Sequence, residues 1–157
     1  MNALYLWLEL TPVGIWVRES AWGFAIGLIL HVWSMAFVVG MSVLMVFSVF
    51  GLAPRVLPSL LGKYLPLTLT AFCISLMSGV LLLCTYPETV LTSNVFWLKM
   101  FFVAVALALT IALKRKCVAL SVSNATPVPL ALKLHAAAIL LVWFCTIVTG
   151  RLLYYTY

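Results

Sequence analysis

The chain has 157 residues, of which 66% are hydrophobic and 8% are charged. Because soluble domains carry about a quarter charged residues, this composition excludes a soluble domain and predicts one integral membrane domain over residues 1–157. The formal charge of +6 is spread too thinly for a nucleic-acid interface, and in a membrane protein such charge usually marks the cytoplasmic loops.

Apolar stretches divide the chain into a short N-terminal segment and four membrane spans. Residues 3–17 are too short to cross a bilayer, so we interpret them as an interfacial helix or an apolar lead-in. The spans are expected at about 21–51, 64–86, 95–113 and 131–152. Each must be helical, because backbone groups in hydrocarbon need internal partners and the segments are too few for a barrel. The predicted fold is therefore an all-α, transmembrane four-helix bundle with up-down topology.

The basic residues predict how this bundle lies in the membrane. Six of them, and no acid, fall near the connections between spans 1 and 2 and between spans 3 and 4: Arg55, Lys63, Lys114, Arg115, Lys116 and Lys133. The other side has three basic residues and all three acids: Arg18, Lys99, Arg151, Glu9, Glu19 and Glu88. The positive-inside rule then places both connections in the cytoplasm. In a bacterium, this is a multi-pass inner-membrane protein with both termini in the periplasm.

The two histidines of the chain both lie in apolar spans. His31 is in the first span, between Glu19 and Arg55 without an intervening charge, and His135 is in the fourth. An ionisable residue within a span is by default a functional-site candidate, and neutral imidazole is a common haem ligand. At about 1.5 Å per residue, His31 lies roughly 18 Å from Glu19 and His135 roughly 24 Å from Arg151. A porphyrin tolerates the resulting offset, so we predict His31 as a ligand of haem b and His135 as a candidate second ligand.

Small residues surround His31 at helical spacing. Gly23 and Gly27 precede the histidine on the same face, and Ser34 follows it. Such residues leave room for a macrocycle, which makes Gly27 a cofactor-binding candidate. They equally match the small-xxx-small pattern of packed membrane helices, and the sequence favours neither alternative. Three further small residues on the second span suit the same space: Ser75, Ser78 and Gly79.

Haem propionates need cationic partners near the membrane interface. Arg151, directly after Gly150, is the preferred partner, whereas Arg18 and Lys99 are interpreted as residues whose charged ends extend to the interface. Without His135 as a ligand, the sixth iron position is open or taken by one of four methionines: Met35, Met41, Met45 or Met77.

Other chemistry is poorly represented in the sequence. All three acids lie at span boundaries, which disfavours a proton-coupled transporter. The four cysteines form no C-x-x-C-H motif, so covalent c-type haem is excluded. Zinc or copper would need more ligands than two histidines supply.

Short motifs over about 20–153 resemble an uncharacterised family of small bacterial inner-membrane proteins with four spans. The matching positions are Ser20-Ala-Trp22, His31, Gly40, Gly79, Asn94-x-x-x-x-Lys99 and Gly150-Arg151-Leu152. The layout is also distantly similar to copper-resistance membrane proteins and haem-binding protoporphyrinogen oxidases, which use intramembrane histidines. The resemblance supports a site at His31 and does not extend to His135. The chain departs from the family where an acidic residue is expected before His31 and Ile26, Gly27 and Leu28 stand instead.

Together these patterns predict a haem b electron-transfer protein that is a subunit or partner of a larger respiratory or oxidoreductase complex. It would relay electrons to or from quinone or a periplasmic carrier, with no substrate chemistry of its own visible. The first alternative is a cofactor-free accessory subunit that packs on other membrane-complex subunits. A small transporter component is the second.

Overall fold

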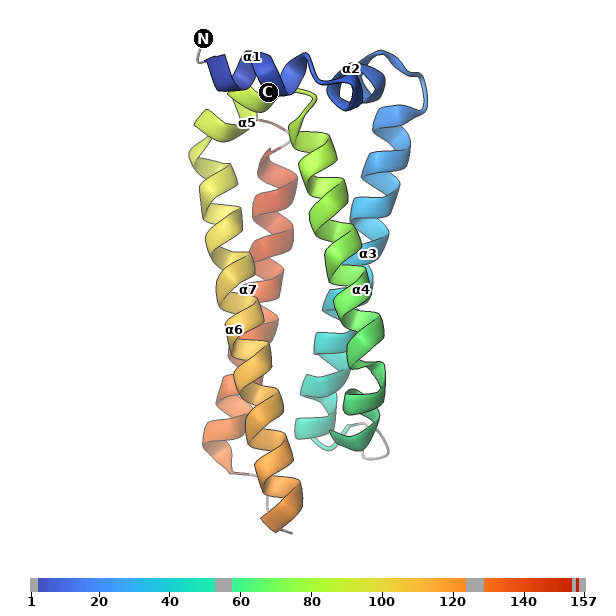
Figure 1. The fold of residues 1–157 in the computed structure, drawn as a ribbon. Coiled ribbons are helices and arrows are strands. Elements are labelled where there is room, and N and C mark those ends of the chain that lie inside the picture. Colours follow the sequence, from blue (N-terminus) through green and yellow to red (C-terminus); the bar gives the residue numbers. More distant parts are fainter. Residues whose placement is uncertain (1–2, 53–57, 124–128, 154, 156–157) are drawn as a thin grey trace.

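The protein is represented by a computed structural model that describes residues 3–52, 58–123, 129–153 and 155, without the side chains of residues 4, 58–65 and 117–123. The described residues form helices and no strand. Four long helices alternate in direction along the chain (Figure 1): α3 (Gly23–Val49), α4 (Pro58–Leu83), α6 (Asn94–Ser123) and α7 (Leu130–Leu153). The predicted all-α four-helix bundle is therefore confirmed.

All four long helices are apolar and long enough to cross a membrane, over Gly23–Val49, Pro66–Leu83, Asn94–Lys116 and Leu130–Leu153. The protein is thus a multi-pass membrane protein whose helices contact lipid. All four spans begin and end close to their predicted bounds. Helix α6, which forms the third span, continues to Ser123, beyond the predicted end of that span at 113, because the basic run Lys114–Lys116 does not interrupt a helix. Of the residues used to predict orientation, Arg55 lies outside the described residues, as does the side chain of Lys63.

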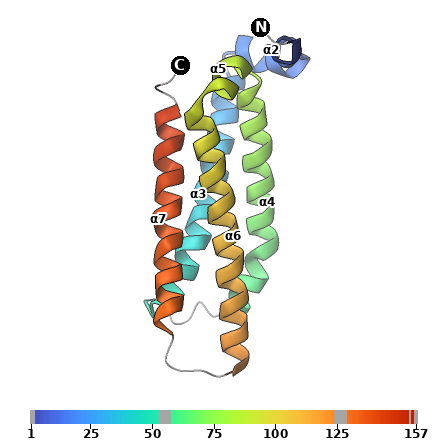
Figure 2. The same ribbon diagram turned by 90° about the vertical axis from the view of Figure 1, so that its left-hand side faces the viewer.

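The four long helices form two hairpins. Helix α3 packs along α4, and α6 packs along α7, while α3 and α7 join the two hairpins and α4 and α6 touch less (Figure 2). We call the end where α3 and α6 begin and α4 and α7 end the termini end, because both ends of the chain lie there (Figure 1). The short helix α5 (Pro87–Thr92) connects the hairpins at this end.

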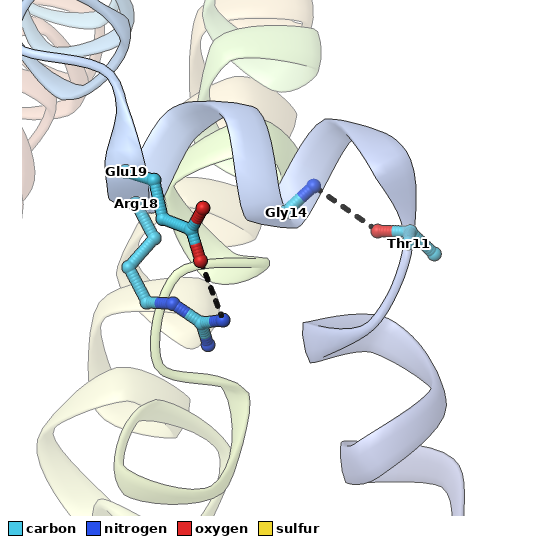
Figure 3. A network of polar contacts seen from close by, with 4 residues as sticks. All are labelled: Thr11, Gly14, Arg18 and Glu19. Atoms are coloured by element: carbon cyan, nitrogen blue, oxygen red, sulfur yellow. Dashed lines mark hydrogen bonds and ion pairs between the residues drawn. The ribbon is translucent and has the colours of Figure 1, made fainter.

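The N-terminal segment forms two short helices across the termini end (Figure 1) rather than the single helix over 3–17 that was one of the predictions. They are α1 (Ala3–Glu9) and α2 (Pro12–Glu19). Thr11 separates them, since its Oγ1 donates to Leu8 O at 2.7 Å. The same oxygen accepts from Gly14 N at 3.1 Å (Figure 3). Pro12 suits the first helical position because it has no N–H to satisfy. Near the end of α2, Arg18 and Glu19 form an ion pair of 3.8 Å (Figure 3).

Gly23 brings α2 close to the start of α3. A Cβ atom at this position would lie 2.9 Å from both Trp16 O and Val17 Cα, so only glycine permits this approach. Val17 is fully buried there. The first small residue before His31 therefore packs against α2 and not against the bundle interior.

The interior of the bundle changes character along its length. From mid-depth to the end opposite the termini, the buried side chains are apolar except for Ser42, whose hydroxyl donates to Val38 O of its own helix. We call the apolar ones the apolar plug: Val38, Met45, Val46, Val49, Ala71, Ala106, Leu113, Leu132, Ala136, Ile139 and Trp143. Toward the termini end, the buried side chains of the long helices are mostly hydroxyls: Ser34, Ser75, Ser78, Thr146 and Thr149. Four of these hydroxyls donate to a backbone carbonyl four residues earlier on their own helix: Ser34, Ser78, Thr146 and Thr149.

Candidate functional site

His31 lies in the polar half of the bundle and contacts α4. Its Nδ1 is 2.9 Å from Ser75 O and 3.3 Å from Ser78 Oγ. A carbonyl oxygen can only accept, so Nδ1 carries the proton and Nε2 of the neutral imidazole keeps its lone pair. Ser75 O also accepts from Ser78 Oγ at 3.1 Å. These contacts fix both the tautomer and the position of the ring.

The two glycines singled out near His31 have different neighbours. A Cβ at Gly79 would lie 3.2 Å from His31 Cε1, so the absence of a side chain makes room for the imidazole. A Cβ at Gly27 would lie 2.7 Å from Cδ2 of Leu81, and Leu82 is also close. The space beside Gly27 is filled by leucines of α4, which is the helix-packing alternative of the small-xxx-small pattern. A role of Gly27 beside a cofactor stays a prediction.

His135 makes the equivalent contact in the other hairpin. Its Nε2 is 2.9 Å from Leu109 O on α6, so Nε2 donates and Nδ1 keeps the lone pair. Each histidine therefore bonds a backbone carbonyl of the helix with which its own helix is paired. The structure does not bring His31 and His135 into contact with a shared neighbour.

The depth difference between the histidines is larger than the sequence indicated. Counted from the termini ends of their own helices at about 1.5 Å per residue, His31 lies about 12 Å deep and His135 about 27 Å deep. Counted through their bonded carbonyls on α4 and α6, the offset is about 10 Å. The distances of about 18 and 24 Å in the sequence analysis correspond to a depth difference of about 6 Å, because they took Glu19 as the start of the first helix. Glu19 instead ends α2, and α3 begins at Gly23.

Lys99 is a second ionisable residue in the polar half of the bundle. It lies on α6 about 8 Å from the start of that helix, and its Cε and Nζ would be 3.6 and 3.7 Å from a Cβ at Gly150 on α7. Its side chain thus runs across the glycine on α7 and is partly buried. Among the described residues, no hydrogen bond or ion pair to Lys99 is present.

Arg151 has a different environment from Lys99. It is exposed, its Nη2 donates to Tyr155 Oη at 3.4 Å, and its Cζ lies 5.4 Å from the Tyr155 ring centroid. This arrangement is a cation–π contact at the outer surface of the termini end. Pairing of Arg151 with a propionate stays a prediction.

Trp143 adds an unpaired donor to the interior. The residue is 2% exposed, and within the described part of the chain its Nε1 has no hydrogen-bond partner. Trp143, Thr146 and Gly150 are spaced by three and four residues, which places them on one face of α7. The face that Lys99 crosses therefore continues inward past a buried threonine to this indole.

No group of three or more histidine, cysteine or acidic side chains that could hold a metal ion occurs among the described residues. Two cavities lie at the termini end, and neither includes His31 or Lys99 in its lining. One of about 430 Å³ is lined by Pro12, Val13, Trp16 and Leu81. The other, of about 160 Å³, is lined by Val17, Arg18, Phe24, Thr85 and Tyr86.

Comparison of the chain with protein-family models, with curated proteins and with solved structures gives no match. The fold and site geometry define the class: a small four-span membrane protein with a histidine, a lysine and hydroxyl groups in one half of its bundle.

The sequence singled out His31 and led us to interpret Lys99 as a residue whose charged end extends to the interface, whereas the structure places its side chain against Gly150. A lysine near a span end usually extends toward the interface, and this general tendency determined the interpretation. Two features could have indicated a buried position for Lys99. It lies five residues inside α6, and Gly150 on the facing helix α7 has no side chain to occupy the space.

Proposed function

We propose that the protein is a membrane electron-transfer protein that binds haem b through His31. The observation that carries the proposal is the hydrogen bond from His31 Nδ1 to Ser75 O. Metal-ligating histidines usually donate their other ring N–H to a carbonyl or carboxylate, which fixes the tautomer and raises the basicity of the ligating nitrogen. In His31 this leaves Nε2 as the iron-binding atom.

The chemistry of the surrounding residues fits such a ligand. Ser75 and Ser78 hold the imidazole, and Gly79 leaves space for it. The proposed site lies in the polar half of the bundle, where hydroxyls replace apolar side chains. Haem, when bound, would supply one-electron transfer, and its potential would depend on the ligand and on nearby charge. His135 is retained as a candidate second ligand, with its larger depth offset as an argument against that role.

The wider setting is part of the same proposal. The distribution of basic residues supports a bacterial inner-membrane location with both termini in the periplasm. The proposed haem then lies in the periplasmic half of the membrane, within reach of quinone or of a periplasmic carrier. With few residues outside the helices, the chain would serve as a subunit or partner of a larger respiratory or oxidoreductase complex. Similarity to the four-span bacterial family rests on its short motifs alone.

An optical spectrum tests the proposal directly. The full chain, purified from a bacterial membrane with haem supplied during expression, should give a reduced-minus-oxidised difference spectrum with Soret and α bands. His31→Ala should remove these bands or weaken haem binding strongly, while His135→Ala tests the candidate second ligand, whose loss would shift the spectrum toward high spin. A spectrum without haem bands in both the isolated chain and its assembled complex would contradict the proposal.

One observation favours a second candidate, a cofactor-free accessory subunit. Both histidines bond backbone carbonyls of the paired helix, His31 to Ser75 and His135 to Leu109. Such bonds between helices stabilise membrane bundles on their own. If this is their only role, His31→Ala and His135→Ala should lower the stability of the bundle to a similar degree. The wild type and both variants should then show no haem bands.

A further inference from the structure

We propose that the termini end binds one phospholipid with an ethanolamine headgroup, its acyl chain in the larger cavity and its headgroup at Arg18 and Glu19. The proposal does not depend on haem binding. Its starting point is the pair of cavities at this end, because successive parts of α2 line both of them.

The larger cavity suits an acyl chain. Its volume of about 430 Å³ is within the range of small-molecule sites, about 300–1,000 Å³. Its lining residues carry no charge: Pro12, Val13, Trp16 and Leu81. A lining of this kind gives water few hydrogen-bond partners, so a lipid chain fills such a space in preference to water.

The larger cavity lies where a phospholipid of the surrounding leaflet can enter it. Helix α2 lies across the termini end, and Leu81 is near the end of α4, so the cavity is in the corner between α2 and a membrane span (Figure 1). Val13 and Trp16 are 51% and 50% exposed, which leaves the corner accessible from outside the protein. An exposed tryptophan at the end of a span is typical of the membrane interface.

The smaller cavity continues the same corner. On α2, Val13 lines the larger cavity and Val17, one helical turn further, lines the smaller one. From the end of α4, Leu81 lines the larger cavity, and Thr85, four residues further along the chain, lines the smaller one. One turn corresponds to about 5.4 Å. The glycerol unit of a phospholipid joins its acyl chains to its phosphate over a distance of this order.

Arg18 and Glu19 present the charges that an ethanolamine headgroup requires. Arg18 lines the smaller cavity, and its Nη2 is 3.8 Å from Oε1 of Glu19 (Figure 3). The two side chains are 33% and 67% exposed, and an ion pair of this kind contributes little by itself. A guanidinium donates several hydrogen bonds to a phosphate, and a carboxylate accepts from an ammonium. The headgroup carries both groups a few bonds apart, so it can pair with both residues at once.

The test measures which phospholipid competes for the site. The full chain in detergent micelles is photolabelled with a trace of phosphatidylethanolamine that carries a diazirine in its acyl chain, and labelled peptides are identified by mass spectrometry. We expect saturable labelling of residues 12–18 and 81–86. Phosphatidylethanolamine should compete at roughly tenfold lower concentration than phosphatidylglycerol with the same chains, because one charge-assisted hydrogen bond contributes on that scale.

Two charge variants assign the headgroup contacts. Glu19→Gln removes the partner of the ammonium, so the two phospholipids should compete equally. Arg18→Gln should weaken competition by both phospholipids about tenfold, because both carry the phosphate. Glu9→Gln is the control, because Glu9 ends α1 at the same end of the bundle and lines neither cavity. It should keep the wild-type preference.

Two tryptophan variants assign the acyl chain. Val13→Trp fills the larger cavity and should abolish saturable labelling of α2. Val32→Trp is the matched control, because Val32 is 53% exposed but lies on α3 and does not line the cavity. It should be labelled like the wild type. An unchanged melting temperature of Val13→Trp in detergent without lipid establishes that this variant is folded.

Three results would overturn the proposal. Equal competition by both phospholipids in the wild type, or a preference that persists in Glu19→Gln, would contradict the headgroup contacts. Saturable labelling of α2 that persists in Val13→Trp would contradict the position of the acyl chain. Competition by a quinone and by neither phospholipid would assign the cavity to a quinone. The haem proposal is tested separately, through its own absorption bands.

Discussion

A Cβ atom at Gly79 would lie 3.2 Å from Cε1 of His31. A side chain at Gly79 on α4 would therefore press on the imidazole from α3 and push it by a few tenths of an ångström from its position against Ser75 O. The residue at position 79 on α4 therefore influences where the His31 imidazole on α3 lies.

Gly79→Ala should displace the imidazole and weaken its bond to Ser75. Gly40→Ala is the matched control, because a Cβ at Gly40 has no neighbour within 4 Å. Alanine in a helix is favoured over glycine by about 1 kcal/mol, so Gly40→Ala should raise the free energy of unfolding. Gly79→Ala should lose that gain and also weaken haem binding. Both quantities are measured by denaturation in detergent and by haem titration. Equal behaviour of the two variants would contradict the contact.

Gly27→Val should destabilise the α3–α4 hairpin. A Cβ at Gly27 would lie 2.7 Å from Leu81 Cδ2, so a branched side chain displaces Leu81 from its place against α3. Overpacking of this kind costs about 1–3 kcal/mol. The companion substitution Leu81→Ala should recover part of the loss, which a double-mutant cycle of unfolding free energies measures. Additive effects of the two substitutions would show that the two side chains do not compete for space.

His135→Leu tests whether this histidine is a second iron ligand. Because Nε2 of His135 bonds Leu109 O and lies deeper than His31, we expect the haem spectrum to stay unchanged. The free energy of unfolding should fall by about 0.6 kcal/mol, the average for a side-chain hydrogen bond between membrane helices. A change from a low-spin toward a high-spin spectrum would instead identify His135 as the second ligand.

Thr11→Ala should loosen the N-terminal helices without affecting the site. The substitution removes the cap that Thr11 Oγ1 provides to Gly14 N and costs about 1 kcal/mol of local stability. Hydrogen exchange should increase in α2 while haem affinity stays constant. Thr11→Ser keeps the hydroxyl and should behave as the wild type, and equal exchange in both variants would argue against the cap.

The fold was predictable from the sequence because composition and span length decide it. Apolar runs closed by charges gave four helices, and alternating connections gave the up-down order. The separation of 3–17 into α1 and α2 at Thr11 and Pro12 had a local signal, a capping hydroxyl before proline. The extension of α6 to Ser123 had no such signal, because hydropathy detects only the apolar part of a helix.

The site was only partly predictable, for a physical reason. Lipid is as apolar as the bundle core, so hydrophobic periodicity does not establish which face of a membrane helix points inward. The partners of His31 and Lys99, on α4 and α7, depend on those rotations. The haem assignment and the roles of Gly27, His135 and Arg151 stay predictions.

The apolar plug also determines how the membrane is sealed. Water that enters the polar half meets Val46, Leu113 and Ala136, all fully buried, and a hydrophobic constriction of this kind excludes water and ions. Proton hopping needs a continuous water or acid–base chain, which this packing interrupts. We therefore expect the half of the bundle that contains the apolar plug to block proton leakage, so vesicles containing the protein should hold a pH gradient as long as vesicles without it.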